Sequence, residues 1–137
     1  MSLVLDASVA LAWCFEDEAT PQSAGLLDRV DREAAIVPGI WSLELANILA
    51  LAERRGRITE ADIVEFVTLL DRLDIRVDGA TAERGLNEVL ALARAEKLTS
   101  YDAAYLDLAM REGLPLATRD NDLIRAARRL GVKIVPA

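Results

Sequence analysis

Apolar residues along the chain fall into short continuous runs and longer stretches with helical spacing. The short runs are bounded by turn residues, a pattern typical of buried parallel strands, and they cover Ser2–Leu5, Ala35–Pro38, Ile75–Asp78, Leu114–Thr118 and Val132–Val135. The helical stretches between them cover about Ser8–Cys14, Gln22–Val30, Ser42–Arg55, Thr59–Leu73, Thr81–Ala95, Thr99–Gly113 and Asn121–Leu130. This alternation predicts a three-layer α/β/α sandwich around a central, mainly parallel sheet.

The apolar stripes also indicate which helix faces should be buried. In the helix at 81–95, the spacing places one stripe inward, made of Leu86, Val89, Leu90 and Ala93. The two central helices carry more apolar residues than one sheet face needs: Ile48, Leu49, Leu51, Ile63, Phe66 and Val67. This excess leaves three readings open, namely a homodimer surface, a groove for a small protein partner, or ordinary core.

Length and charge narrow the picture. A chain of 137 residues can bury one core, so we expect a single domain over residues 1–137. Its formal net charge is −7, which argues against non-specific nucleic-acid binding by a broad basic face. Any chemistry on RNA or DNA would therefore need locally placed cations, either a bound metal ion or a small arginine cluster.

Two residue types restrict the available chemistry. Histidine is absent and Cys14 is the only cysteine, which excludes thiolate zinc sites, disulfide frameworks and Cys–His nucleophile pairs within one chain. The apolar N-terminal stretch is interrupted by Asp6 and has no basic flank, so it predicts neither a signal peptide nor a membrane span. We expect a cytoplasmic protein that does not enter membranes.

Four carboxylates fall where ligands bind in open parallel sheets, just beyond the carboxyl ends of the strands. Asp6 and Asp120 follow the first and fourth strands, Glu44 lies in the first turn after the second strand, and Asp102 lies in the first turn of the helix that Thr99 opens. Each one alone has a structural explanation as a helix cap or a dipole partner.

Together, the four acids favour a metal site. Carboxylates gathered at one end of a sheet repel one another unless a cation lies between them. Mg²⁺ and Mn²⁺ prefer carboxylate and water oxygens, and an oxygen-only site is what this composition leaves open. One or two such ions could activate water and stabilise the leaving oxygen of a phosphodiester.

At this point the motifs resemble a known family. In order along the chain they are Leu5-Asp6-Ala7-Ser8-Val9-Ala10, Val37-Pro38 with Trp41-Ser42-Leu43-Glu44-Leu45-Ala46-Asn47, Ser100-Tyr101-Asp102-Ala103-Ala104-Tyr105 and Pro115-Leu116-Ala117-Thr118-Arg119-Asp120. Their order and spacing resemble the PIN-domain signature of VapC-type toxins, the ribonucleases of type II toxin–antitoxin systems. The resemblance covers essentially the whole chain.

The resemblance implies a PIN-like fold in which Asp6, Glu44, Asp102 and Asp120 hold Mg²⁺ or Mn²⁺. It implies an endoribonuclease that cleaves single-stranded RNA through metal-activated water, with no covalent enzyme intermediate. It further implies a homodimer and a small antitoxin protein whose C-terminal segment lies near the acids. The residues that match polar positions around the pocket are Ser8, Asn47 and Thr118, whose reading as local caps and turn residues stays equally open.

Several neighbouring residues have weaker assignments. Asp122 lies two positions after Asp120 and is an additional candidate ligand, whereas Asp107 should point elsewhere as a solvated helix residue. Arg119 is the best candidate for contact with RNA at the pocket rim. Tyr101 and Tyr105 are one helical turn apart and could stack on bases, although core packing explains them better.

Other functions remain open beside the toxin. A PIN nuclease of RNA processing would use the same residues. A metal-free protein-binding module, in which the acids only cap helices, is a rival of a different class. Phosphoacceptor receiver domains have paired acids after the first strand and a later lysine, and haloacid-dehalogenase-type phosphatases have an aspartate at position 8, where this chain has Ser8.

Overall fold

The computed structural model describes residues 2–137 and contains one five-stranded sheet. Its strands run β3-β2-β1-β4-β5, and every neighbouring pair is parallel. The strands are short: β1 (Val4–Leu5), β2 (Ala35–Val37), β3 (Ile75–Val77), β4 (Leu116–Ala117) and β5 (Ile134–Val135). The prediction of a central parallel sheet is confirmed, and the strands fall inside the predicted runs.

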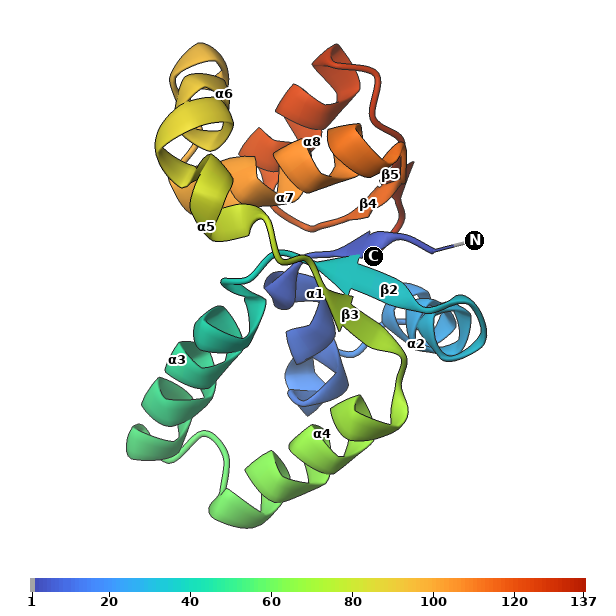
Figure 1. The fold of residues 1–137 in the computed structure, drawn as a ribbon. Coiled ribbons are helices and arrows are strands. Elements are labelled where there is room, and N and C mark those ends of the chain that lie inside the picture. Colours follow the sequence, from blue (N-terminus) through green and yellow to red (C-terminus); the bar gives the residue numbers. More distant parts are fainter. Residues whose placement is uncertain (1) are drawn as a thin grey trace.

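Helices cover both faces of the sheet (Figure 1). One layer contains α1 (Ala7–Ala10), η1 (Leu11–Trp13), η2 (Glu16–Glu18), α2 (Pro21–Glu33), α3 (Trp41–Arg54) and α4 (Glu60–Arg72). The other contains α5 (Thr81–Arg84), the π-helical turn η3 (Gly85–Val89), α6 (Leu90–Glu96), α7 (Ser100–Glu112) and α8 (Asn121–Arg129). The α/β/α sandwich is thus confirmed.

Local sequence sets many of the helix ends. Thr20 and Thr59 each begin a helix with a capping box, in which the threonine hydroxyl accepts from the backbone N–H three residues later. Helix α7 ends at Gly113, whose φ of 63° is a left-handed conformation that glycine adopts without steric cost. Such caps explain why the predicted ends of α4 and α7 agree with the observed ones within one residue.

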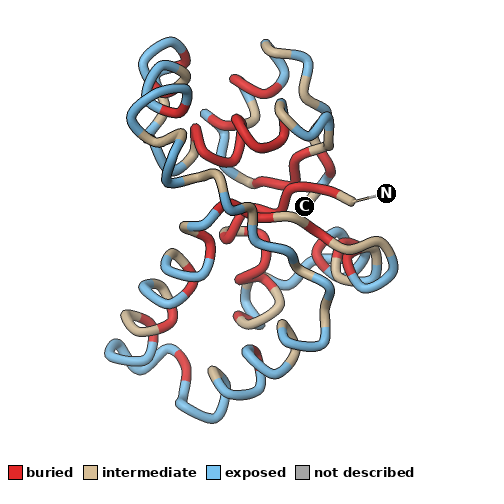
Figure 2. Tube along the Cα trace, in the orientation of Figure 1, coloured by how far each residue is buried: buried red, intermediate tan, exposed pale blue. Residues whose placement is uncertain are grey.

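The strands and the inner faces of α1 and α7 form the core (Figure 2). Tyr105, Leu106 and Leu108 of α7 are fully buried against β1 and β4. Trp41 is also buried, whereas Trp13 is partly buried and donates through Nε1 to the Ser23 carbonyl oxygen. None of the described helices has both the length and the apolar character needed to cross a membrane.

One predicted apolar stripe is wrong in part. Val89 and Ala93 are buried, but Leu86 is 86% exposed and Leu90 is 42% exposed. The reason is the π-helical turn at Gly85–Val89, which takes more residues than a regular turn and therefore rotates Leu86 away from the face that buries Val89. A strict 3.6-residue period cannot predict this shift.

The order of the strands creates a switch point between β1 and β4. From β1 the chain moves outward through β2 and β3, and it then returns to add β4 and β5 on the other side. Connections leave β1 and β4 toward opposite faces, and in open parallel sheets ligands bind beyond the carboxyl ends of the strands at such a point. Asp6 and Thr118 are the residues that directly follow these two strands.

Candidate functional site

Asp6 directly follows β1 at this switch point and is held by hydroxyl groups. Thr118 Oγ1 donates to Asp6 Oδ2 at 2.7 Å, and Ser8 Oγ donates to the same oxygen at 3.0 Å. Asp6 is 5% exposed. Burial raises the pKa of its carboxyl, these hydrogen bonds oppose the rise, and the negative charge of Asp120 adds to it. The side chain is therefore fixed in orientation but poorly compensated in charge.

Glu44 approaches the site from the first turn of α3. Its Oε1 accepts a hydrogen bond of 2.6 Å from the hydroxyl of Tyr105, a fully buried residue of α7. Burial raises the pKa of Glu44, the hydrogen bond from Tyr105 lowers it, and the charge of Asp6 raises it further. Burial also raises the pKa of Tyr105 strongly, so its hydroxyl remains a donor.

Asp102 and Asp120 complete the group. Burial of Asp102 in the first turn of α7, together with the charges of Asp120, Asp6 and Glu44, raises its pKa to about 6. Asp120 is more exposed and accepts a hydrogen bond from the Leu123 backbone N–H, which makes it the cap of α8. The negative charges of the other three carboxylates each raise the pKa of Asp102. The structure therefore brings the four predicted acids to one end of the sheet.

The donor set fits a hard divalent cation in its chemistry and its charge. All four side chains offer carboxylate oxygens, which Mg²⁺ and Mn²⁺ prefer, and their mutual repulsion favours a cation between them. Within residues 2–137, however, no three acidic or cysteine side chains already stand where they could hold one ion together. The fit to a cation therefore lies in the chemistry and the charge of the four acids.

The three predicted supporting residues differ in position. Ser8 and Thr118 both donate to Asp6, and Thr118 Oγ1 also accepts from the Asp120 backbone N–H at 3.1 Å. Thr118 thus links two of the acids. Asn47 is exposed on α3, three residues after Glu44. The structure joins the two hydroxyl residues to the acids and leaves Asn47 at the rim.

Asp122, a candidate metal ligand, and Arg119, a candidate RNA contact, both interact with other residues. Asp122 is exposed and pairs with Arg125 at 2.9 Å, and it is not among the charges that raise the pKa of Asp102. Arg119 Nη2 donates to the carbonyl oxygen of Glu18 at 3.3 Å, and Nη1 lies 3.8 Å from the Glu18 carboxylate. The structure therefore does not bring Asp122 to the four acids, and it orients Arg119 toward the η2 turn.

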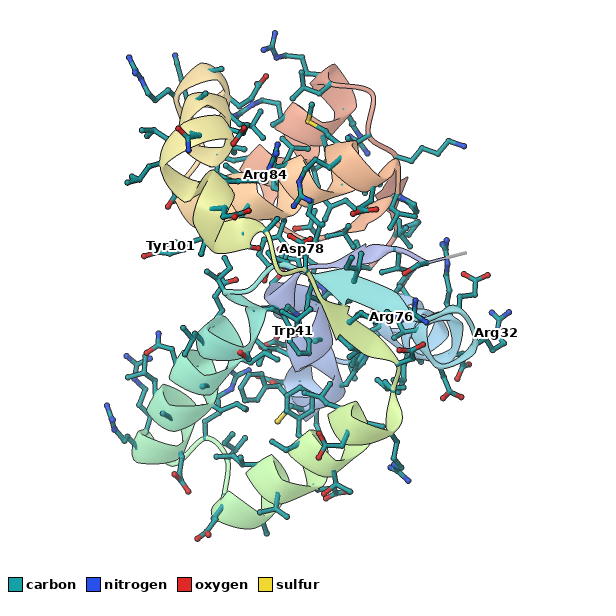
Figure 3. The ribbon with its side chains drawn as sticks, in the orientation of Figure 1. Arg32, Trp41, Arg76, Asp78, Arg84 and Tyr101 are labelled. Atoms are coloured by element: carbon teal, nitrogen blue, oxygen red, sulfur yellow. The ribbon has the colours of Figure 1, made fainter. Side chains whose placement is uncertain are left out.

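The expectation of a solvated Asp107 is wrong. Asp107 is buried, and it accepts hydrogen bonds from Arg84 Nε at 2.7 Å and from Arg111 Nε at 3.1 Å. Arg111 also pairs with Asp78, which follows β3; Figure 3 shows Arg84 and Asp78 near the junction of α5 with the sheet. Asp107 does point away from the four acids, as expected, because it lies on another face of α7.

Tyr105 is the functional residue that sequence reasoning underestimated. Its burial agrees with the expected core packing. Its hydroxyl nevertheless reaches Glu44 in α3 and accepts from the Ala7 backbone N–H at 3.4 Å. The available signal was its spacing of three residues from Asp102, which places both side chains on neighbouring positions of one helix face. Tyr101, in contrast, is 58% exposed and projects outward (Figure 3).

An apolar groove lies apart from the acids, between α3, α4 and β3. It has a volume of about 310 Å³, and its apolar lining includes Trp41, Leu45, Leu49, Val67 and Val77. Of the apolar stripe predicted for α4, only Phe66 is buried, and Val67 is 43% exposed. The central helices therefore retain accessible apolar surface, and ordinary core accounts for only part of the predicted excess.

Comparison with known proteins identifies the sequence pattern and the fold. The family model described as "PIN domain" matches residues 3–129. No curated protein matches the chain.

Several solved structures share the fold. PAE2754 from Pyrobaculum aerophilum has a TM-score of 0.69 at 25% identity, over 98% of this chain and 92% of the other. VapBC2 from Rickettsia felis, bound to a DNA fragment from their promoter, has a TM-score of 0.70 at 14% identity, over 100% and 99% of the two chains. FitAcB from Neisseria gonorrhoeae has a TM-score of 0.63 at 20% identity, over 98% and 96%.

Proposed function

The chain belongs to the PIN-domain family, and from this premise we propose that it is a metal-dependent endoribonuclease that cleaves single-stranded or loop RNA. PIN domains are nucleases, so hydrolysis of a phosphodiester is the reaction that the site has to serve. The proposed cofactor is Mg²⁺ or Mn²⁺, as one or two ions held by Asp6, Glu44, Asp102 and Asp120.

One observation carries the proposal: the four carboxylates meet at the switch point without cationic partners. Within residues 2–137, no ion pair joins any of them to a lysine or arginine, and burial and mutual repulsion raise the pKa of Asp102 to about 6. Such an arrangement costs free energy in the unliganded protein, and a divalent cation offsets that cost. Helix capping alone does not explain why the charges of three other carboxylates all raise the pKa of Asp102.

In the proposed reaction, a bound divalent cation supplies a Lewis acid that activates water and offsets the charge that develops on the phosphate. Asp6, whose orientation is fixed by Ser8 and Thr118, would be one ligand of this cation. Asp102, in the first turn of α7, and Asp120, the N-cap of α8, would be two others. The chain has no histidine, so carboxylates and water carry the protons in this site.

We assign the nuclease to a toxin–antitoxin pair, in line with the VapC-type motifs. One structural neighbour, VapBC2, is a two-component complex on promoter DNA. An accessible apolar groove on α3 and α4, lined in part by Trp41 and Val67, offers a small antitoxin protein a surface to bury. Homodimerisation remains a prediction for the same central helices, and so does a role in RNA processing outside a toxin pair.

RNA contact by Arg119 also remains a prediction. Its guanidinium lies beside Glu18, so an RNA phosphate would compete with that carboxylate for it. The pair is partly exposed, with 27% and 32% of the two side chains accessible, and partly exposed ion pairs are weak. Exchange of Glu18 for a phosphate is therefore energetically inexpensive.

The proposal is tested by incubating a panel of structured RNAs with the protein and Mg²⁺ or Mn²⁺. We expect cleavage in loops by the parent, none after chelation with EDTA, and none by Asp6→Asn. Asp28→Asn is the matched control, because Asp28 is an exposed acid of α2. Asp122→Asn in the same assay decides whether Asp122 contributes to the site. Absence of cleavage by the parent, or equal cleavage by Asp6→Asn, would contradict the proposed mechanism.

A further inference from the structure

We propose that Tyr105 is a positioning residue: its hydroxyl holds the Glu44 carboxylate in the orientation in which Glu44 faces the cation. This inference deepens the proposed function and rests on it. It concerns a side chain that has no carboxylate of its own and for which the sequence favours core packing over base stacking.

The contacts of Tyr105 join three separate parts of the site. Its hydroxyl donates to Glu44 Oε1 at 2.6 Å, across 61 positions of the sequence. The same oxygen accepts from the backbone N–H of Ala7 at 3.4 Å, and Ala7 directly follows Asp6. Asp102 lies three residues before Tyr105 on α7. One hydroxyl thus ties Glu44 to the two segments that carry Asp6 and Asp102.

Core packing alone does not account for a tyrosine at this position. The side chain is fully buried, and a buried hydroxyl costs free energy unless it is hydrogen-bonded. A phenylalanine would fill the same space without that cost. Here the hydroxyl both donates and accepts, and its donor hydrogen bond goes to a carboxylate, which is a stronger acceptor than a neutral group.

This arrangement restricts the rotamers that the Glu44 side chain can adopt. The side chain is long, and it comes from the first turn of α3 rather than from a strand end. Tyr105 holds Oε1 of Glu44, which leaves Oε2 available to a cation. Without this hydrogen bond the carboxylate would sample several rotamers, and an ion would have to order it on binding.

The first test measures Mn²⁺ binding to the full chain by isothermal titration calorimetry, without RNA. We expect Tyr105→Phe to weaken Mn²⁺ affinity about 10- to 100-fold, the range typical of residues that orient a metal ligand. Tyr101→Phe is the matched control, because it removes a hydroxyl from an exposed tyrosine one turn earlier on the same helix. An affinity for Tyr105→Phe equal to that of the parent would overturn the inference.

The second test separates positioning from a general structural effect. On a cleaved RNA at saturating Mn²⁺, Tyr105→Phe should lower kcat and leave KM unchanged, because the hydroxyl does not touch RNA. In metal-free protein, a double-mutant cycle of Tyr105→Phe and Glu44→Ala should show non-additive effects on unfolding. Additive effects would show that the hydrogen bond to Glu44 has no role.

These outcomes distinguish the inference from the proposed function. If the parent binds Mn²⁺ and Asp102→Asn does not, the metal centre stands, and only the Tyr105→Phe result decides the positioning role. If the parent does not bind Mn²⁺ at all, the proposed function fails and the role of Tyr105 toward the cation fails with it.

Discussion

Two aspartates of helix α7 lie in opposite electrostatic surroundings. Asp102, in its first turn, faces three other carboxylates, and its pKa is raised to about 6 by burial and by their charges. Asp107, five residues later, is only 7% exposed, and burial alone would raise its pKa, yet the hydrogen bonds from Arg84 and Arg111 outweigh burial and lower it. The same residue type on the same helix thus has a pKa shifted in opposite directions.

The difference shows how a structural acid differs from one available for a ligand. Around Asp107, buried charge is compensated within the chain, because Arg111 bridges Asp107 and Asp78. Around Asp102, the compensation has to come from outside the chain. We therefore expect substitutions around Asp102 to affect activity and metal binding, and substitutions around Asp107 to affect stability.

The largest effect should come from Asp102→Asn. We expect RNA cleavage to fall at least about 1000-fold, equivalent to about 4 kcal/mol of transition-state stabilisation, because a metal ligand is lost. The melting temperature of the metal-free protein should stay the same or rise, since one repulsive charge is removed. Single-turnover cleavage and thermal melting measure the two effects, and a strongly destabilised variant would contradict the assignment of Asp102.

Asp107→Asn should have the opposite profile. It leaves Arg84 and Arg111 without a carboxylate partner, and loss of one member of a buried ion pair costs about 3 kcal/mol. We choose the lower end of the usual range because the two arginines remain about one quarter exposed, at 26% and 22%. Urea unfolding measures the loss. Cleavage by the folded variant at low temperature should remain close to that of the parent.

Added metal should stabilise a variant of the Asp107 region but not a variant of the Asp102 region. An ion that binds only the folded state stabilises it by about 2.7 kcal/mol at 100 times its dissociation constant. We expect Mn²⁺ to raise the melting temperature of the parent and of Asp107→Asn, and to have no effect on Asp102→Asn. If all three proteins gain the same stability, the ion binds outside the carboxylate group.

The smallest expected effect is the pH dependence of the free energy of unfolding in metal-free protein. The pKa of Asp102 is raised in the folded state, so its contribution to stability should fall as pH rises from about 4 to about 6. The pKa of Asp107 is lowered, so its contribution is present above about pH 4 and is lost as pH falls through the folded pKa. The free energy of unfolding of the parent and of each Asn variant is measured across pH 3–7. The parent-minus-variant difference should fall with rising pH for Asp102→Asn and rise with it for Asp107→Asn. Parallel curves would contradict the comparison.

Much of the fold could be predicted because its signals are local. Apolar runs ended by turn residues identified the strands, and threonine caps identified several helix starts, including Thr59 and Thr99. The exceptions are equally instructive. The exposure of Leu86 follows from a π-helical turn, and no residue type marks such a turn in advance. The incomplete burial of α4, in which Val67 stays exposed beside the buried Phe66, depends on tertiary packing.

The candidate site was predictable in its acids and less so in their surroundings. Asp6 and Asp120 follow strands, and the carboxyl ends of parallel strands meet at one edge of the sheet, so their proximity follows from topology. The partners of Asp107 and Arg119 could not be predicted, because ion pairs between distant segments depend on packing. Asp107, expected in solvent, is buried between two arginines for this reason.

The sequence by itself determined which elements form and which residue types are available for chemistry: carboxylates, no histidine and one cysteine. Hydrophobic periodicity and capping act within a few residues, so they can be recognised along the chain. Only the tertiary structure decided that Tyr105 reaches Glu44 while Asp107 turns toward Arg84 and Arg111. Such contacts depend on distances and burial across the whole fold, since a charge or a hydroxyl acquires its energy from the groups that surround it.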